Sequence, residues 1–381
     1  MNKCNIIPIF VPHMGCPHDC IFCNQRKITN FVDVLDEVDI RRNIEQYISY
    51  FKNKTIPIEI AFYGGSFTGL DKNLMISYLD IAKEYIDKGF VSSIRLSTRP
   101  DYINHEILDI LKKYEVKTIE LGVQSITKST LDLNNRGHDV ECIYKSSTLI
   151  KKYDIKLGLQ MMVGLYGDTF DMVINTAFEL CKINPDFVRI YPTLIIRDTE
   201  LERLYYFKKY IPMSLEDSIY LCKYIYIIFK YYDIPIIRLG LQSSDNISEN
   251  GDIVAGPYHP AFRELVESSV YRDFIEYYMC FFDIKDDITI KCNNSEVSKI
   301  VGNKRSNLKY FKEKYNINIK IKTLTLEKNI LKFNENIVYM NDFIDYYFNK
   351  NIQGDKSIVL YNTISSEDIL KKANEDKNEE H

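Results

Sequence analysis

Short apolar and β-branched runs alternate with amphipathic or charged stretches along the first two thirds of the chain. Such runs predict strands, and the stretches between them, with apolar residues three or four positions apart, predict helices. The expected strands are Ile6–Val11, Pro57–Tyr63, Ser93–Ser97, Lys117–Val123, Lys156–Val163 and Asp186–Tyr191, with Ile234–Gly240 as an extension. The expected helices include Val38–Tyr50, Asn73–Lys88 and Asp139–Tyr153.

Repeated strand–helix units predict an α/β fold with a parallel sheet. Six such units up to about residue 210 predict a partial TIM-type (β/α)6 barrel. In such barrels the chemistry lies at the carboxyl ends of the strands. We expect the barrel to occupy residues 1–285, a small α+β module residues 286–350, and a tail residues 351–381, polar and charged from Lys371 to His381.

Charge supports this division. The whole chain has a net charge of −4, which excludes a general polycation, so any nucleic-acid site must be a local patch. Between Ile288 and Leu324 there are nine basic and two acidic residues, a net +7, whereas the rest of the chain carries −11. This asymmetry indicates a separate basic module.

No apolar run approaches the roughly 18 residues of a membrane span, and no export signal is visible, so the sequence predicts a cytoplasmic protein without membrane contact. The chain has nine cysteines. Six are scattered, and in a chain of this kind we expect them to be buried thiols rather than disulfides. These six are Cys4, Cys142, Cys181, Cys222, Cys280 and Cys292.

The other three cysteines, Cys16, Cys20 and Cys23, follow the first expected strand in a Cys-x3-Cys-x2-Cys spacing. Thiolates are the usual ligands of 4Fe-4S clusters, and three ligands leave one iron open to chelate a small molecule. The alternative is a zinc site with His13 or His18 as the fourth ligand, although structural zinc usually takes two separated ligand pairs.

This spacing after a first barrel strand, with aromatic Phe22 before the last cysteine, resembles the radical S-adenosylmethionine (SAM) superfamily. The resemblance implies a 4Fe-4S cluster on these cysteines and SAM as the second cofactor. It also implies reductive cleavage of SAM to a 5′-deoxyadenosyl radical, with an electron donor such as ferredoxin or flavodoxin.

Polar and glycine-rich segments end the next strands, and each alone would indicate only a turn, a helix cap or a surface charge. Following the cluster motif, they resemble the SAM contacts of the same superfamily, except that Ser97 replaces a usual Glu and Tyr166 a usual Pro. The residues implied in cofactor binding are Gly64, Gly65, Ser66, Ser97, Thr98, Gln124, Arg136, Gln160 and Met162.

The segment Arg189–Leu201 resembles the Elongator catalytic subunit more than the oxygen-independent coproporphyrinogen oxidases. That subunit modifies the wobble uridine of tRNA, so the resemblance implies a tRNA substrate contacted by Arg189, Tyr191 and Arg197. No side chain is singled out as catalytic. After residue 285 no acetyltransferase-like pattern follows, so we expect none of that domain.

The basic module is expected to run strand, helix, turn, helix, strand. The elements are Ile288–Cys292, Glu296–Val301, the turn Gly302–Arg305, Ser306–Tyr315 and Ile317–Lys322. This order resembles a KH domain, whose glycine-led turn clamps a nucleic-acid backbone. Lys304 and Arg305 are therefore expected to contact RNA phosphates. The alternative is an ordinary α+β module with a solvated basic face.

Three functions remain open at this point: a radical enzyme that modifies tRNA, a radical enzyme acting on a small molecule such as a porphyrin precursor, and an RNA-binding protein with a structural cluster. Failure to bind tRNA would favour the second. Failure to cleave SAM after reduction would favour the third.

Overall fold

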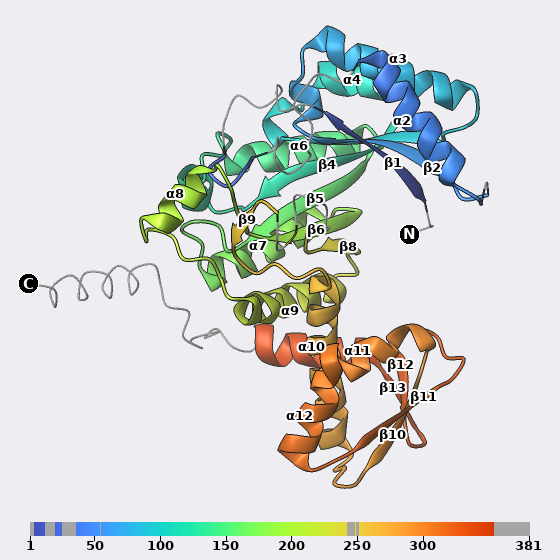
Figure 1. Ribbon diagram of the computed structural model, residues 1–381, viewed down its shortest axis with the longest axis vertical. Helices are drawn as coiled ribbons and strands as arrows, with labels where there is room; N and C mark the ends of the chain where they lie inside the picture. The colour runs from blue at the N-terminus through green and yellow to red at the C-terminus, as the bar shows by residue number, and fades with distance from the viewer. Residues whose placement is uncertain are drawn as a thin grey trace, which may run out of the picture.

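The computed structural model describes residues 4–11, 20–24, 36–53, 55–241, 248 and 251–353. A seven-stranded sheet forms the larger lobe, in the order β1-β2-β3-β4-β5-β6-β8 (Figure 1). Its strands are β1 (Asn5–Val11), β2 (Ile58–Gly64), β3 (Ser93–Thr98), β4 (Val116–Gln124), β5 (Lys156–Val163), β6 (Phe187–Pro192) and β8 (Ile236–Leu239). A separate two-stranded pair joins β7 (Ile195–Ile196) to β9 (Ile253–Ala255).

All neighbouring strands of the large sheet pair in parallel. The first and last strands stay at the edges, so the described strands form a curled half-barrel rather than a closed barrel. The partial α/β barrel expected from the sequence is therefore confirmed, including the seventh strand after Ile234.

Helices connect the strands, most of them on the convex face of the sheet (Figure 1). They are α2 (Glu37–Tyr50), α3 (Lys72–Asp87), α4 (His105–Lys113), α5 (Lys128–Leu133), α6 (Val140–Lys152), α7 (Phe170–Ile183), α8 (Glu200–Tyr206), α9 (Leu215–Tyr231) and α10 (Phe262–Phe281). Sequence signals set their ends: the Asp71 carboxylate accepts from the first turn of α3, and Asn184 ends α7 with a left-handed φ of 56°. Within the described ranges, no helix is long and apolar enough to cross a membrane.

Every second residue of the strands faces these helices, and those residues are apolar. On β3 and β4 they include Ile94, Leu96, Ile119 and Leu121, each with no exposed surface. Alternation along a strand then turns the intervening residues to the concave face. The core therefore lies between the sheet and its helices, and the concave face is left for other side chains.

The smaller lobe contains a second sheet in the order β11-β10-β12-β13. Its elements are β10 (Ile288–Cys292), α11 (Val297–Val301), α12 (Ser306–Tyr315), β11 (Ile319–Thr323), β12 (Ile330–Phe333), β13 (Asn336–Tyr339) and α13 (Met340–Phe348). β10 and β11 pair in parallel, and the expected order strand, helix, turn, helix, strand is present. The KH identity of this lobe stays a prediction.

Helix α10 joins the two lobes by packing on α9 and on α11. Its Ser268 is held by the Asn307 amide of α12, with Nδ2 2.9 Å from the Ser268 carbonyl oxygen. The chain then returns through α13, where the Phe348 ring stacks on Tyr231 of α9 at 3.7 Å. One continuous apolar core includes residues of both lobes. The division at residue 285 stays a prediction.

The scattered cysteines behave as expected only in part. Cys181, Cys222 and Cys292 are buried, and burial raises their thiol pKa values. Cys280, however, is exposed, so its expected burial is wrong. It lies in the last turn of α10, where the neighbouring Phe281 is also exposed. Cys4 and Cys142 are half-buried.

Candidate active site

The concave face of the half-barrel carries a row of polar side chains at the same level of adjacent strands. Register places Ser97 of β3 beside Glu120 of β4, Gln160 of β5 beside Arg189 of β6, and Arg189 beside Arg238 of β8. Met162 and Tyr191 are paired one step nearer the carboxyl ends of their strands. The structure thus brings together Ser97, Gln160, Met162, Arg189 and Tyr191, five of the residues singled out in the sequence.

Glu120 is the centre of this row, with no exposed surface. Its carboxylate accepts from Arg189 Nη2 at 3.0 Å and from Arg95 Nη1 at 3.1 Å, and Arg189 Nε forms an ion-pair contact of 2.5 Å with it. The Tyr63 hydroxyl donates to it at 3.1 Å and the Gln160 amide at 3.2 Å. All these groups come from four different strands, so the network depends on the curvature of the sheet.

The electrostatics of this network keep its phenols protonated. Burial, reinforced by the Glu120 charge, raises the pKa of Tyr63 well above its usual range, and burial also raises the pKa of Tyr191. A second ion pair, 2.8 Å long, joins Arg95 to Glu59. The concave face can therefore offer hydroxyl and guanidinium donors to a polar ligand at neutral pH.

Above this row, at the carboxyl ends of the strands, lies the end of the cysteine loop. Cys20 is buried, and Arg136 Nη1 lies 3.1 Å from its sulfur. Arg136 Nη2 also donates to the Gly122 carbonyl of β4, and Arg99 holds the Arg136 carbonyl oxygen, each at 2.5 Å. The Cys20 sulfur thus lies beside a fixed cation at the carboxyl ends of the strands.

The loop end is held on both sides by segments distant in sequence. The Ile21 amide donates to the Asn134 carbonyl at 3.3 Å, and the Leu201 amide donates to the Ile21 carbonyl at 2.7 Å. Asn24 donates to the Arg197 carbonyl at 3.1 Å. Arg197 thus reaches the site through its backbone, while its side chain is 54% exposed and approaches Asp252. Its role in substrate binding stays a prediction.

Gln124 and Arg136 present unsatisfied polar atoms at the carboxyl ends of the strands beside Cys20, the region called the mouth below. A β-bulge after Gly122 and a left-handed φ of 67° turn Gln124 out of the regular strand. Its Oε1 and the Arg136 Nε are buried and have no hydrogen-bond partner among the described residues. Buried polar atoms normally have partners, so these two atoms fit a site that a polar ligand completes.

The remaining cofactor candidates also lie at this mouth. Gly64 ends β2 with a φ of 96°, which favours glycine, and the Gly65 amide donates to the Val11 carbonyl at 3.2 Å. Ser66 and Thr98 are buried, and the Thr98 hydroxyl lies 2.7 Å from that of Thr68. Their contacts with SAM stay predictions.

Other candidates lie elsewhere or outside the described residues. Cys16, His13 and His18 are not among the described residues. Cys23 is described, and its amide donates to the Cys20 carbonyl at 2.9 Å. Lys304 and Arg305 are exposed on the smaller lobe, both with positive φ, and are not grouped with the mouth residues (Figure 1).

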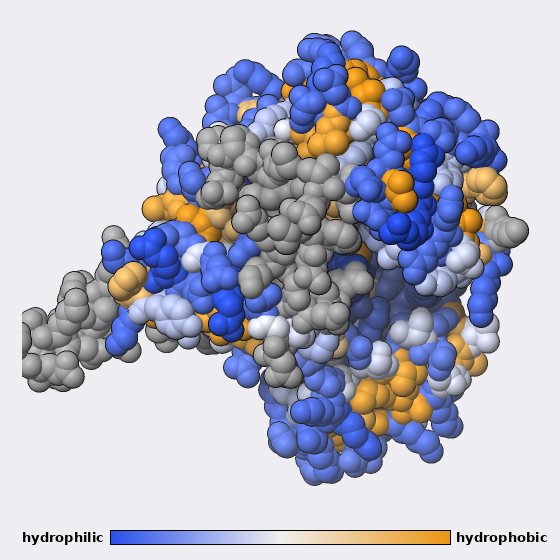
Figure 2. Space-filling model, turned by 45° about the horizontal axis from the view of Figure 1, so that its top comes forward, coloured by the Kyte–Doolittle hydropathy of each residue, from blue (hydrophilic) through white to orange (hydrophobic). Residues whose placement is uncertain are grey.

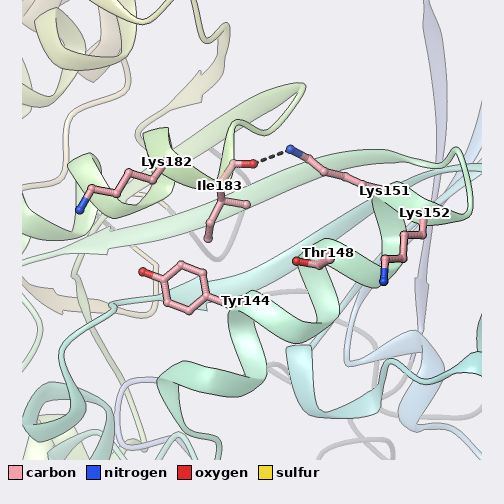
Figure 3. Close-up of a pocket in the computed structure, with 6 residues that line it drawn as sticks. All are labelled: Tyr144, Thr148, Lys151, Lys152, Lys182 and Ile183. Carbon is pink, nitrogen blue, oxygen red and sulfur yellow. Dashed lines mark hydrogen bonds between the residues drawn. The ribbon is translucent and has the colours of Figure 1, made fainter.

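One surface cavity of about 460 Å³ lies between the ends of α6 and α7 (Figure 3). Lys151 crosses it to reach the Ile183 carbonyl, and Lys152, Lys182 and Tyr144 also line it. Helices α6 and α7 end there just before the next strands begin, so the cavity is at the amino-terminal edge of the sheet. It is therefore separate from the mouth, where chemistry occurs in folds of this type.

Sequence reasoning gave no role to Glu59, Tyr63, Arg95 or Glu120. The signal was present: several strands have polar residues between apolar ones at alternate positions, as in Ser93, Arg95 and Ser97 of β3. In a barrel strand that alternation indicates an inward polar face.

Taken together, these features define an α/β half-barrel protein with a thiol site and a polar ligand site at the strand ends. Residues 10–180 match the model of the radical SAM superfamily, and residues 185–272 match that of the radical SAM C-terminal domain. The chain belongs to the radical SAM superfamily. Members of this superfamily use a 4Fe-4S cluster and SAM, which confirms both expected cofactors.

Several known proteins are similar to the chain. An uncharacterized protein of Methanocaldococcus jannaschii, MJ0486, is 29% identical over 249 residues, which cover 62% of this chain and 74% of that protein. A tRNA uridine(34) acetyltransferase of the same organism is 26% identical over 58% of this chain and 48% of its own length. The chain thus spans about half of that relative.

Among solved structures, Elp3 of Methanocaldococcus infernus with an N-terminal deletion superposes with a TM-score of 0.57 at 22% identity. The match covers 72% of this chain and 64% of that one. It supports the shared fold. Elongator complex protein 3 of Schizosaccharomyces pombe is 34% identical over 33% of this chain and 24% of its own length. The expected resemblance to the Elongator group is confirmed.

Proposed function

We propose that this radical SAM enzyme modifies tRNA, with Cys16, Cys20 and Cys23 as cluster ligands. The cluster, when bound and reduced, supplies the electron that cleaves SAM to a 5′-deoxyadenosyl radical. The donor set fits this group: the Cys20 thiol faces a cation and is held at the strand ends by two backbone hydrogen bonds to Ile21. We expect Arg136 and Gln124 to bind SAM through their unpaired buried atoms.

The concave face is the proposed position of the reacting nucleoside. It lies below the mouth, and Tyr63, Gln160 and Arg189 bring hydrogen-bonding groups to it. Enzymes that modify a base generally take it out of its stack and recognise its polar edge in a pocket. We expect Tyr191 to line the same space, next to Ser97 and Met162, which the family resemblance implies in cofactor binding. The chain's own residues would then orient the nucleoside, while burial limits the access of water.

The tRNA assignment depends on the sequence similarity of this chain to proteins whose names refer to tRNA modification or to Elongator. The matched part of the chain is similar to a tRNA uridine(34) acetyltransferase and to Elongator complex protein 3. The basic segment 288–324 adds a surface that fits phosphates, and Lys304 and Arg305 are both exposed there. The group transferred and the electron donor, ferredoxin or flavodoxin, stay open.

The test compares tRNA nucleosides from a strain lacking the gene with those from strains complemented by the wild type or by Cys20→Ala. Mass spectrometry should show one modified nucleoside that is lost on deletion and restored only by the wild type. Purified Cys20→Ala should retain less iron. If deletion changes no tRNA nucleoside while wild-type protein still cleaves SAM, the small-molecule alternative replaces this proposal.

A further inference from the structure

Helix α8 and the turn that follows it carry an exposed pair of aromatic rings close to the mouth. Tyr206 is 65% exposed and Phe207 68% exposed, and Ile211 beyond them is 56% exposed. Figure 1 shows α8 projecting from the edge of the larger lobe. On the face drawn in Figure 2, apolar side chains form patches within a mainly hydrophilic surface.

The base of this projection is fixed to the site already described. Leu201, in the first turn of α8, donates its amide to Ile21 of the cysteine loop at 2.7 Å. Tyr210, at the end of the turn, is buried, and its hydroxyl donates to the Gly164 carbonyl after β5 at 2.6 Å. Two anchors in the mouth therefore hold an aromatic tip at its rim.

The tip itself has a defined backbone. The Lys208 amide donates to the Tyr205 carbonyl at 2.9 Å, and the Lys209 amide donates to the Leu204 carbonyl at 2.8 Å. Lys208 has a left-handed φ of 57°, which ends the helix. A turn whose backbone is already ordered loses little backbone entropy when it binds a partner.

The charge of the tip is positive. Lys208 and Lys209 are exposed and have no ion pair among the described residues. The acidic residues of α8 are already engaged: Glu200 pairs with Arg203 at 2.9 Å, and Glu202 accepts from the Asp198 amide at 2.8 Å. Two rings and two adjacent unpaired lysines thus lie next to each other at the rim.

We infer that this tip, formed by Tyr206, Phe207, Lys208 and Lys209, binds unpaired nucleotides of an RNA whose reacting nucleoside enters the mouth. Aromatic rings stack on any exposed base, and lysines contact the phosphates between bases. A base-paired helix hides its base faces, so the tip would select a loop. The inference rests on the proposed function and adds the part of the RNA that is recognised.

The first test measures binding of the full-length protein to two RNA probes at one salt concentration. One probe is a short hairpin with an unpaired loop, and the other is a fully paired duplex of the same length. The double variant Tyr206→Ala, Phe207→Ala should bind the hairpin about tenfold to a hundredfold more weakly and the duplex unchanged. The matched control, Tyr50→Ala with Phe90→Ala, removes rings that are 61% and 54% exposed, and should bind both probes like the wild type.

The second test separates rings from charges. Lys208→Gln with Lys209→Gln should flatten the salt dependence of hairpin binding, by about 0.7 in logarithmic slope for each phosphate that is no longer neutralised. The aromatic variant should keep the wild-type slope, because stacking releases no counterions. SAM cleavage without RNA should be unchanged in both variants.

Equal hairpin affinity for the wild type and the aromatic variant would overturn the inference and leave the proposed function standing. Wild-type protein that binds neither hairpin, duplex nor tRNA would overturn both. If the wild type instead forms dimers that the aromatic variant lacks, and its hairpin affinity does not depend on the rings, the tip is a contact between copies of this chain.

Discussion

Replacing Glu120 by Gln should destabilise the protein strongly, although it only exchanges one carboxylate oxygen for an amide nitrogen and removes the charge. The carboxylate has no exposed surface and is the partner of Arg189 at 2.5 Å and of Arg95 at 3.1 Å. Arg95 keeps a second carboxylate, Glu59, at 2.8 Å. Arg189 has no other acidic partner among the described residues, so the variant leaves one largely buried guanidinium uncompensated.

Breaking one side of a buried ion pair costs about 3–5 kcal/mol of folding free energy. In a chain of this size each kcal/mol lowers the thermal midpoint by about 2 °C, so we expect a decrease of about 6–10 °C. The matched control is Glu106→Gln, whose partner Lys72 is equally close at 2.5 Å but whose side chain is 68% exposed. An exposed ion pair contributes at most about 1 kcal/mol to stability, so the control should change the thermal midpoint by no more than about 2 °C.

Thermal unfolding followed by circular dichroism measures both variants. A second substitution, Arg189→Met, should restore part of the stability lost in Glu120→Gln, because it removes the unpaired charge. Arg95→Met should restore less, since Arg95 still has Glu59. A Glu120→Gln protein as stable as the wild type, or equal rescue by the two arginine substitutions, would refute this account of the network.

Three further predictions concern separate parts of the chain. Burial raises the pKa of Asp168 from 3.8 to about 7, so the folded state binds the proton more tightly than the unfolded state. The stability of the protein should therefore fall as the pH rises between those values. Thermal scans of Asp168→Asn should not show this pH dependence, and a variant with the pH profile of the wild type would contradict the prediction. In Gly158→Ala, the new Cβ would lie 2.3 Å from the buried Phe187 ring. Chemical denaturation should therefore show a loss of about 1–3 kcal/mol in the free energy of unfolding. No loss would mean that the ring moves aside without cost. Lys304→Glu with Arg305→Glu should weaken tRNA retention in filter binding and leave SAM cleavage intact. The logarithmic salt dependence of binding should fall by roughly 0.7 to 0.9 for each phosphate that the turn no longer neutralises. If this variant and the wild type bind tRNA with equal affinity, the turn is not part of the RNA site.

The strands of the half-barrel could be predicted because apolar and β-branched residues recur at every second position in short runs bounded by turns. The strands that were not predicted are short. β7 and β9 each have two or three residues and pair across more than fifty positions, as Ile195 does with Ala255. β12 and β13 form a hairpin whose first strand, Ile330–Phe333, has four residues. Pairing of this kind depends on tertiary position rather than on local pattern.

The candidate site also combines features that the local sequence predicts with features that depend on tertiary structure. The cysteine spacing is local and could be recognised, whereas the Arg136–Cys20 contact joins residues 116 positions apart. No spacing rule predicts that contact. The Glu120 network was predictable in principle, because polar residues at alternate positions of several strands must meet on the concave face of a curled sheet.

The polarity of that concave face argues for its use by a ligand. The convex face of the same strands is apolar and fully buried, as at Ile119 and Leu121, and it supplies the burial that stabilises the sheet. A well-packed apolar face in place of Glu120, Arg95 and Arg189 would be about as stable or more so, since desolvation offsets most of the attraction in buried ion pairs. Folding alone therefore does not require these charges. We infer that the donors of this face are retained to hold a polar substrate below the cofactor site, and that substitutions which keep the protein folded there will alter substrate selection before they alter SAM cleavage.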